Sequence, residues 1–96
     1  MYVVVSYDVE TKTPAGKRRL RKVARACLDF GQRVQFSVFE CNLRRQEWVV
    51  LRKRLLDAFD SGHDSLRFYF LGEEASERIE HHGTKETTDP TGLLLA

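Results

Sequence analysis

The chain has 96 residues, of which 42% are apolar and 31% charged, and its formal net charge is +2. This length suits one domain, and the composition suits a folded chain rather than a disordered one. No apolar run approaches the roughly 20 residues of a membrane span, and the N-terminus lacks the features of a signal peptide, so we expect a cytoplasmic protein without membrane association. Cys27 and Cys41 are expected to be reduced core residues, because two widely spaced cysteines give no disulfide framework.

Positive and negative side chains separate along the sequence. Most lysines and arginines lie between Lys12 and Arg54, whereas the stretch after Asp57 is mainly acidic. The modest net charge therefore conceals a basic first half, and the folded chain can present a basic face. Such a face is typical of proteins that bind phosphate backbones.

The first apolar run, residues 1–7, predicts a buried strand, because its three consecutive valines are β-branched and the run is short for a helix. Asp8 follows where this strand meets water. A carboxylate at a strand end is held rigidly yet stays open to solvent, which suits coordination of Mg²⁺ or Mn²⁺. The alternative is that Asp8 caps the turn at residues 11–13.

A basic helix is predicted next, with Thr13 as N-cap, Pro14 at the first helical position and Gly31 at the end. Its apolar residues recur at intervals of three and four and form one stripe: Leu20, Val23, Ala24, Cys27 and Leu28. The basic residues of this helix are candidate contacts to nucleic acid: Lys17, Arg18, Arg19, Arg21, Lys22 and Arg25. The alternative is a solvated amphipathic helix without a ligand.

Residues 33–36 and 38–43 predict two strands, or one strongly bent strand, with the break near Ser37. Residues 45–59 predict a second helix that Gly62 ends, with Trp48, Leu51, Leu55, Ala58 and Phe59 as its apolar stripe. Residues 64–71 predict a strand in which Leu66, Phe68 and Phe70 face one way and Arg67 and Tyr69 the other. This order of elements indicates an α+β fold, the ferredoxin-like βαββαβ sandwich.

In that sandwich two helices cover one face of an antiparallel sheet, so the other face needs a second cover. Tyr69, Phe36 or Phe39, and the apolar residues 93–95 are candidates, and we expect a two-fold homodimer with stacked sheets. Residues 77–82 are expected to add a short edge strand, which the dimer could exchange. The domain is thus expected to span residues 1–83. Residues 84–96 are expected to form a flexible tail, whose apolar end at residues 93–96 either frays or hooks a partner.

Four segments are specific when they are taken together. They are Tyr7-Asp8-Val9, the basic residues 17–24, the stretch 31–41, and the strand 64–69 with the following Leu71-Gly72. Together they resemble the CRISPR-associated protein 2 family, whose members act in the adaptation stage of CRISPR immunity. The resemblance covers about residues 1–83.

The resemblance implies a ferredoxin-like homodimer that works with CRISPR-associated protein 1, the integrase that inserts new spacer DNA. It also implies that Asp8 faces the partner's Asp8 across the two-fold axis and that this pair binds Mg²⁺ or Mn²⁺. Some family members are described as metal-dependent nucleases of RNA or duplex DNA, and others look like structural adaptors. Arg33, Ser37 and Phe39 match the family's activity-linked segment. Their alternatives are a surface charge, a turn residue and core packing, respectively.

Two functions therefore stay open. One is an architectural homodimer that binds duplex DNA through its first helix and bridges the integrase, with no chemistry of its own. The other is a metal-dependent endonuclease, a phosphodiesterase acting on duplex DNA or single-stranded RNA, whose active centre is the Asp8 pair. We favour the architectural role as the biological one and treat catalysis as conditional.

Overall fold

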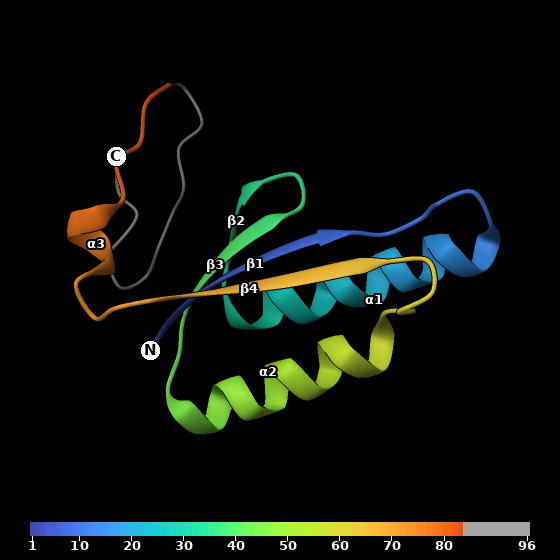
Figure 1. The fold of residues 1–96 in the computed structure, drawn as a ribbon, viewed down its shortest axis with the longest axis horizontal. Coiled ribbons are helices and arrows are strands. Elements are labelled where there is room, and N and C mark those ends of the chain that lie inside the picture. The colour runs from blue at the N-terminus through green and yellow to red at the C-terminus, as the bar shows by residue number, and fades with distance from the viewer. Residues whose placement is uncertain (84–96) are drawn as a thin grey trace.

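The computed structural model describes residues 1–83, and the predicted tail at residues 84–96, with its apolar end, lies outside them. The elements follow in the order β1 (Tyr2–Asp8), α1 (Pro14–Phe30), β2 (Gln32–Gln35), β3 (Val38–Asn42), α2 (Arg45–Ala58), β4 (Ser65–Leu71) and α3 (Ala75–Arg78). The strands form one antiparallel sheet in the order β2-β3-β1-β4, with both long helices on the same side of it (Figure 1). The predicted ferredoxin-like sandwich is confirmed.

Alternation along the strands decides which side chains the helices cover. On β1, Val3, Val5 and Tyr7 are buried in the core, whereas the residues between them point to the opposite face. From α2, Trp48 packs edge-on against the ring of Phe68 in β4, with ring centroids 4.9 Å apart. The sheet face that carries Asp8 is the one that the two long helices leave open.

The start and end of α1 lie where the sequence predicts. Thr13 caps the helix, because its hydroxyl oxygen accepts a hydrogen bond from the Gly16 backbone N–H at 3.0 Å. Gly31 ends it with extended backbone, and a Cβ at that position would lie 2.5 Å from the carbonyl oxygen of Glu40. The predicted apolar stripe is wrong at one position: Leu28 is 46% exposed, and Ala26 is buried instead. Ala26 faces α2 because it lies one turn after Val23.

The region near Ser37 resolves into two strands, β2 and β3, joined by a tight turn at Phe36 and Ser37. The second helix, α2, ends at Ala58 with Phe59 as its C-cap, within one residue of the predicted end. The chain leaves the helix there because Asp60 enters a turn, in which its carboxylate accepts a hydrogen bond from the Gly62 N–H at 2.9 Å.

The short edge strand predicted at residues 77–82 is absent from the described part of the chain. The segment instead begins with the helical turn α3, in which Ala75 is buried against Tyr2. The Ala75 N–H donates to the Gly72 carbonyl, which closes the chain into a turn rather than extending it along the sheet. The α3 turn therefore covers one end of the open face. Within residues 1–83, neither long helix has the length and apolar character that crossing a bilayer requires.

Candidate functional site

The carboxylate of Asp8 lies exposed at the end of the central strand β1, on the open face of the sheet. Pairing on both sides holds that strand, and Asp8 itself lies opposite Ser65 of β4. Among residues 1–83, no side chain or backbone group forms a hydrogen bond or ion pair with this carboxylate. The Asp8 carboxylate is therefore held at a fixed position, and its oxygens are available to a ligand from outside this chain.

The alternative role predicted for Asp8, capping the turn at residues 11–13, is not what the structure shows. A different acid, Asp64, holds the loop after β1, because its Oδ1 accepts a hydrogen bond from the Glu10 backbone N–H at 3.1 Å. Asp64 also receives Arg19 Nε at 2.7 Å and the Asp60 backbone N–H at 2.9 Å, both on Oδ2. One carboxylate thus ties the start of β4 to the loop that follows Asp8 and to α1.

The Asp64 side chain has no exposed surface, and its surroundings favour the charged form. The hydrogen bond from the Arg19 guanidinium is the largest influence, and backbone N–H groups add to it against the opposing effect of burial, so the pKa of Asp64 is lowered to about 2. Sequence reasoning missed this residue and counted it among the acidic second half. The available signal was an acid directly before a strand that starts beside the end of β1.

Three residues of the predicted activity-linked segment lie apart from the Asp8 carboxylate. Phe39 has no exposed surface, which agrees with the packing alternative. Arg33 points to the same helix-covered side, with its guanidinium carbon 5.0 Å from the centroid of the Phe39 ring. Ser37 lies nearer to the site through its backbone, because its carbonyl accepts the Tyr7 N–H at 3.1 Å. The structure thus separates Arg33 and Phe39 from Asp8 by the thickness of the sheet.

Tyr7 connects this packed side to the end of β1. Its ring stacks with Phe39 at a centroid distance of 6.1 Å, and its side chain is hydrogen-bonded to Arg33. Burial raises the pKa of Tyr7, and the Arg33 hydrogen bond partly offsets this rise. Since Tyr7 directly precedes Asp8, Arg33 and Phe39 help to fix the strand end from behind.

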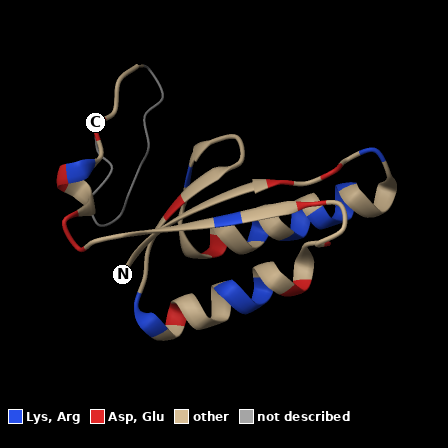
Figure 2. Ribbon diagram, viewed as in Figure 1, with Lys and Arg blue, Asp and Glu red and all other residues tan. Residues whose placement is uncertain are grey.

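Cations gather along α1 and α2 in Figure 2. Four of them on α1 recur at intervals of three and four, so they lie on one side of the helix, and all four are exposed; we call them the α1 basic row: Arg18, Arg21, Lys22 and Arg25. Lys17 is also exposed beside this row. Arg19 differs from the others, because its guanidinium binds Asp64 and its side chain is 20% exposed. Arg19 therefore contributes to the architecture of the loop rather than to the exposed row.

A divalent ion can be tested against the residues around Asp8. Residues 1–83 contain no group of three or more histidine, cysteine, aspartate or glutamate side chains placed to hold a metal. Mg²⁺ is commonly bound through only one or two carboxylates with several waters retained, so one exposed, unpaired carboxylate suits part of such a site. Asp8 can therefore supply one carboxylate ligand to such an ion, and residues 1–83 place no group of further acidic, histidine or cysteine ligands beside it.

Comparison with known proteins is consistent along the whole chain. The family model described as CRISPR associated protein Cas2 matches residues 1–79. The CRISPR-associated endoribonuclease Cas2 of Chlorobaculum tepidum is 57% identical over 95 residues, which cover 99% of each chain. The protein of the same name from Nitratidesulfovibrio vulgaris is 50% identical over 95 residues, covering 99% of this chain and 93% of the relative.

Solved structures give the same assignment. The crystal structure of Streptococcus pyogenes Cas2 matches with a TM-score of 0.75 and 52% identity, and the match covers 86% of this chain and 100% of that one. The resemblance seen in the sequence is thus confirmed by a family model, by curated relatives and by a solved fold. The chain belongs to the CRISPR associated protein Cas2 family.

Proposed function

We propose that this protein is a homodimeric, nucleic-acid-binding endonuclease whose two Asp8 carboxylates hold one Mg²⁺ or Mn²⁺ between them. The observation that carries this proposal is the exposed, unpartnered Asp8 carboxylate on the open face of the sheet. The names of the two curated relatives, both endoribonucleases, support RNA as the first substrate class to test. Duplex DNA is the second substrate class.

In this proposal the chain itself supplies position and charge. The central strand holds each Asp8 at a fixed place, while exposed lysines and arginines attract the nucleic-acid backbone. A bound divalent ion would activate water and offset the negative charge that develops on the attacked phosphate. Arg33 and Phe39 act as positioning residues, because they pack behind the strand end and do not reach the open face. Ser37 likewise positions Tyr7 through its carbonyl group.

A second function is favoured by a separate observation. The α1 basic row is exposed, and three of its members, Arg18, Arg21 and Lys22, form no ion pair among residues 1–83. Unpaired cations on one helix side suit sequence-independent contact with a phosphate backbone. The second candidate is therefore an adaptor without chemistry, which binds duplex DNA and bridges the CRISPR-associated protein 1 integrase.

Cleavage and binding measured on the same samples test both functions. The proteins are wild type, Asp8→Asn, and Glu77→Gln as a control that removes an exposed carboxylate from α3, at the Tyr2 end of the sheet rather than the Asp8 end. Each is incubated with labelled single-stranded RNA or linear duplex DNA in Mg²⁺, Mn²⁺ or chelator, and binding is titrated in parallel. We also measure Mg²⁺ binding by calorimetry, which needs no cleavage.

For the endonuclease, we expect metal-dependent cleavage by wild type and Glu77→Gln, and a rate at least about a hundredfold lower in Asp8→Asn. The variant should also lose the calorimetric Mg²⁺ signal while it retains nucleic-acid binding. Binding without cleavage under every condition would overturn the endonuclease and leave the adaptor. Cleavage that Asp8→Asn retains would show that another site performs the chemistry.

A further inference from the structure

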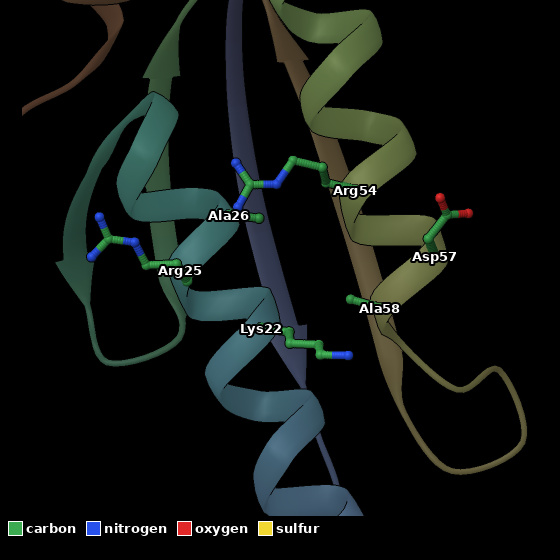
Figure 3. Close-up of a pocket in the computed structure, with 6 residues that line it drawn as sticks. All are labelled: Lys22, Arg25, Ala26, Arg54, Asp57 and Ala58. Atoms are coloured by element: carbon green, nitrogen blue, oxygen red, sulfur yellow. The ribbon is translucent and has the colours of Figure 1, made fainter.

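A groove of about 330 Å³ opens between the two long helices, on the layer opposite the face that carries Asp8. Its lining residues come from both helices: Lys22, Arg25, Ala26, Arg54, Asp57 and Ala58. The two alanines leave the space between the helices unfilled, since a methyl group is the whole of their side chain. Lys22 extends from α1 toward α2, and Arg54 extends from α2 toward α1, so their charged groups approach the groove from opposite sides (Figure 3).

Arg54 is held in place at this groove by two contacts. Its Nη1 donates to Asp29 Oδ2 at 3.0 Å, and its guanidinium carbon lies 5.9 Å from the centroid of the Phe30 ring. The other oxygen of Asp29 receives Arg25 Nη2, also at 3.0 Å. Arg25 and Arg54 therefore both bind the carboxylate of Asp29. The side chain of Arg54 is 40% exposed and that of Arg25 is 71% exposed, so each keeps N–H donors that are open to solvent.

The groove keeps an excess of positive charge. Lys22 forms no ion pair among the described residues, and the carboxylate of Asp57 is paired with Lys53 at 2.9 Å. Asp29 is shared between two arginines, so it offsets only one of their charges. A planar guanidinium with parallel donors suits a phosphate group, which offers several acceptor oxygens and a full negative charge, and the Lys22 ammonium adds positive charge to the same groove.

We propose that this groove binds one phosphodiester group of a nucleic-acid backbone, with Arg54 and Lys22 as its main donors and Arg25 at its rim. The proposal rests on the nucleic-acid binding proposed above and adds a contact of α2 that the sequence did not reveal. Because the groove and Asp8 lie on opposite layers, the groove is a holding site rather than part of the cleavage site. Nucleic acid held there contacts the protein on the helix side.

Variants that each remove one positive charge from α1 or α2 test the groove. Arg54→Gln and Lys22→Gln each remove a groove cation, whereas Arg52→Gln removes an exposed cation of α2 that does not line the groove. We measure the affinity for a short duplex DNA and its dependence on salt. Each groove variant should bind about tenfold more weakly at low salt, with a salt slope smaller by about one, and Arg52→Gln should change affinity less than about twofold.

A variant that is expected to strengthen binding distinguishes loss of a contact from loss of folding. Asp29→Asn releases Arg25 and Arg54 from their shared carboxylate, so we expect it to bind duplex DNA roughly threefold more tightly, an outcome that a misfolded protein does not give. Glu77→Gln, which removes an exposed carboxylate from α3, serves as the control for the change in net charge. Asp29→Asn should increase the affinity for duplex DNA clearly more than Glu77→Gln does.

The outcomes separate the two proposals. One outcome is that wild type binds nucleic acid while Arg54→Gln, Lys22→Gln and Arg52→Gln all weaken binding equally. Binding then depends only on overall charge. That result would overturn the groove proposal and leave the proposed function standing. If Asp29→Asn and Glu77→Gln tighten binding equally, the same conclusion holds. If wild type binds neither RNA nor DNA, the proposed function itself is overturned, and this inference falls with it.

Discussion

At the scale of single residues, Asp64 has the largest structural role that the sequence concealed. Its buried carboxylate receives hydrogen bonds from Glu10, Arg19 and Asp60, which belong to three separate segments. Each of these donors would be left without its partner if the carboxylate were lost, and unpaired buried donors are costly. The position of the loop after Asp8 therefore depends on an acid that does not belong to the open face.

Asp64 should make the stability of the protein depend on pH in the acid range. The pKa of Asp64 is about 2 in the folded chain, below the ordinary value of 3.8, so its contribution is complete above about pH 4 and is lost as the pH falls toward 2. We expect the free energy of unfolding, measured with urea at several pH values, to decline over this interval. Asp64→Asn should be less stable by about 2 kcal/mol near neutral pH and should show less of this decline.

The matched control for this experiment is Asp57→Asn. Asp57 is 65% exposed and makes one exposed pair with Lys53, so its loss should cost less than about 1 kcal/mol. An unchanged acid decline in Asp64→Asn would contradict the role assigned to Asp64, because the titration would then come from other carboxylates.

Phe39 provides a direct contrast between packing and chemistry. Its ring is fully buried and stacks with Tyr7, so Phe39→Ala should destabilise the fold by about 3 to 5 kcal/mol through the cavity it leaves. Phe39→Leu keeps most of the volume, and we expect it to lose less than about 1.5 kcal/mol and to retain nucleic-acid binding and cleavage. A stably folded Phe39→Leu without activity would instead assign the ring a direct role.

Sequence reasoning placed Asp8 at the solvent-exposed end of the first strand, where the structure has it, but could not separate the residues around it by face. Alternation within β1 made the exposure of Asp8 predictable, because Tyr7 and Asp8 must point to opposite sides. The side on which Arg33 lies depends on how β2 pairs with β3, and that register shifts between Arg33 and Gln35. Arg19 is similar, since nothing in its helix position reveals that Asp64 occupies its guanidinium.

At the scale of elements, the loop after β1 and the first turn of α1 approach each other closely at Gly16. A Cβ on Gly16 would overlap the carbonyl oxygen of Glu10 and lie 3.0 Å from its carbonyl carbon. We therefore expect Gly16→Ala to push the first turn of α1 away from the loop and to cost about 1 to 3 kcal/mol in urea unfolding.

Gly62→Ala is the control for this substitution. The added Cβ would lie 3.4 Å from a carboxylate oxygen of Asp60, in an exposed turn, which is an ordinary contact. We expect a change within about 0.5 kcal/mol. Equal losses in the two variants would mean that glycine flexibility, rather than the close approach at Gly16, determines the effect.

Most elements followed from local pattern, and the exceptions have identifiable causes. The caps of α1 and the alternation of β4 are local signals, so the sequence predicted both. The helical turn α3, which stands where an edge strand was predicted, depended on Ala75 packing against Tyr2 near the other end of the chain. Contacts of that kind are tertiary, and a window along the sequence does not contain them.

At the scale of the whole molecule, the open face of the sheet predicts a dimer. Tyr69 projects from β4 on that face and is 44% exposed. A two-fold interface there would bring each Tyr69 toward its counterpart, so Tyr69→Glu should place like charges together and yield monomers. We expect ultracentrifugation to give the mass of a dimer for wild type and of a monomer for this variant, which should also lose Mg²⁺ binding at Asp8.

The control replaces an exposed apolar residue on the other layer. Val49 lies on α2 and is 62% exposed, so Val49→Glu should leave the dimer and its Mg²⁺ binding intact. If wild type sediments as a monomer and still binds Mg²⁺, the paired Asp8 site is contradicted.

The central place of β1 in the sheet has a consequence for how the protein opens. This strand is paired on both sides, whereas β2 lies at the edge, pairs only with β3 and does so with an irregular register. Amide hydrogens of β2 should therefore exchange with solvent through local opening, while those of β1 exchange only when the whole sheet comes apart. Asp8 continues this strand beyond its doubly paired part and pairs with Ser65 of β4, so partial unfolding at the β2 edge leaves its carboxylate in place.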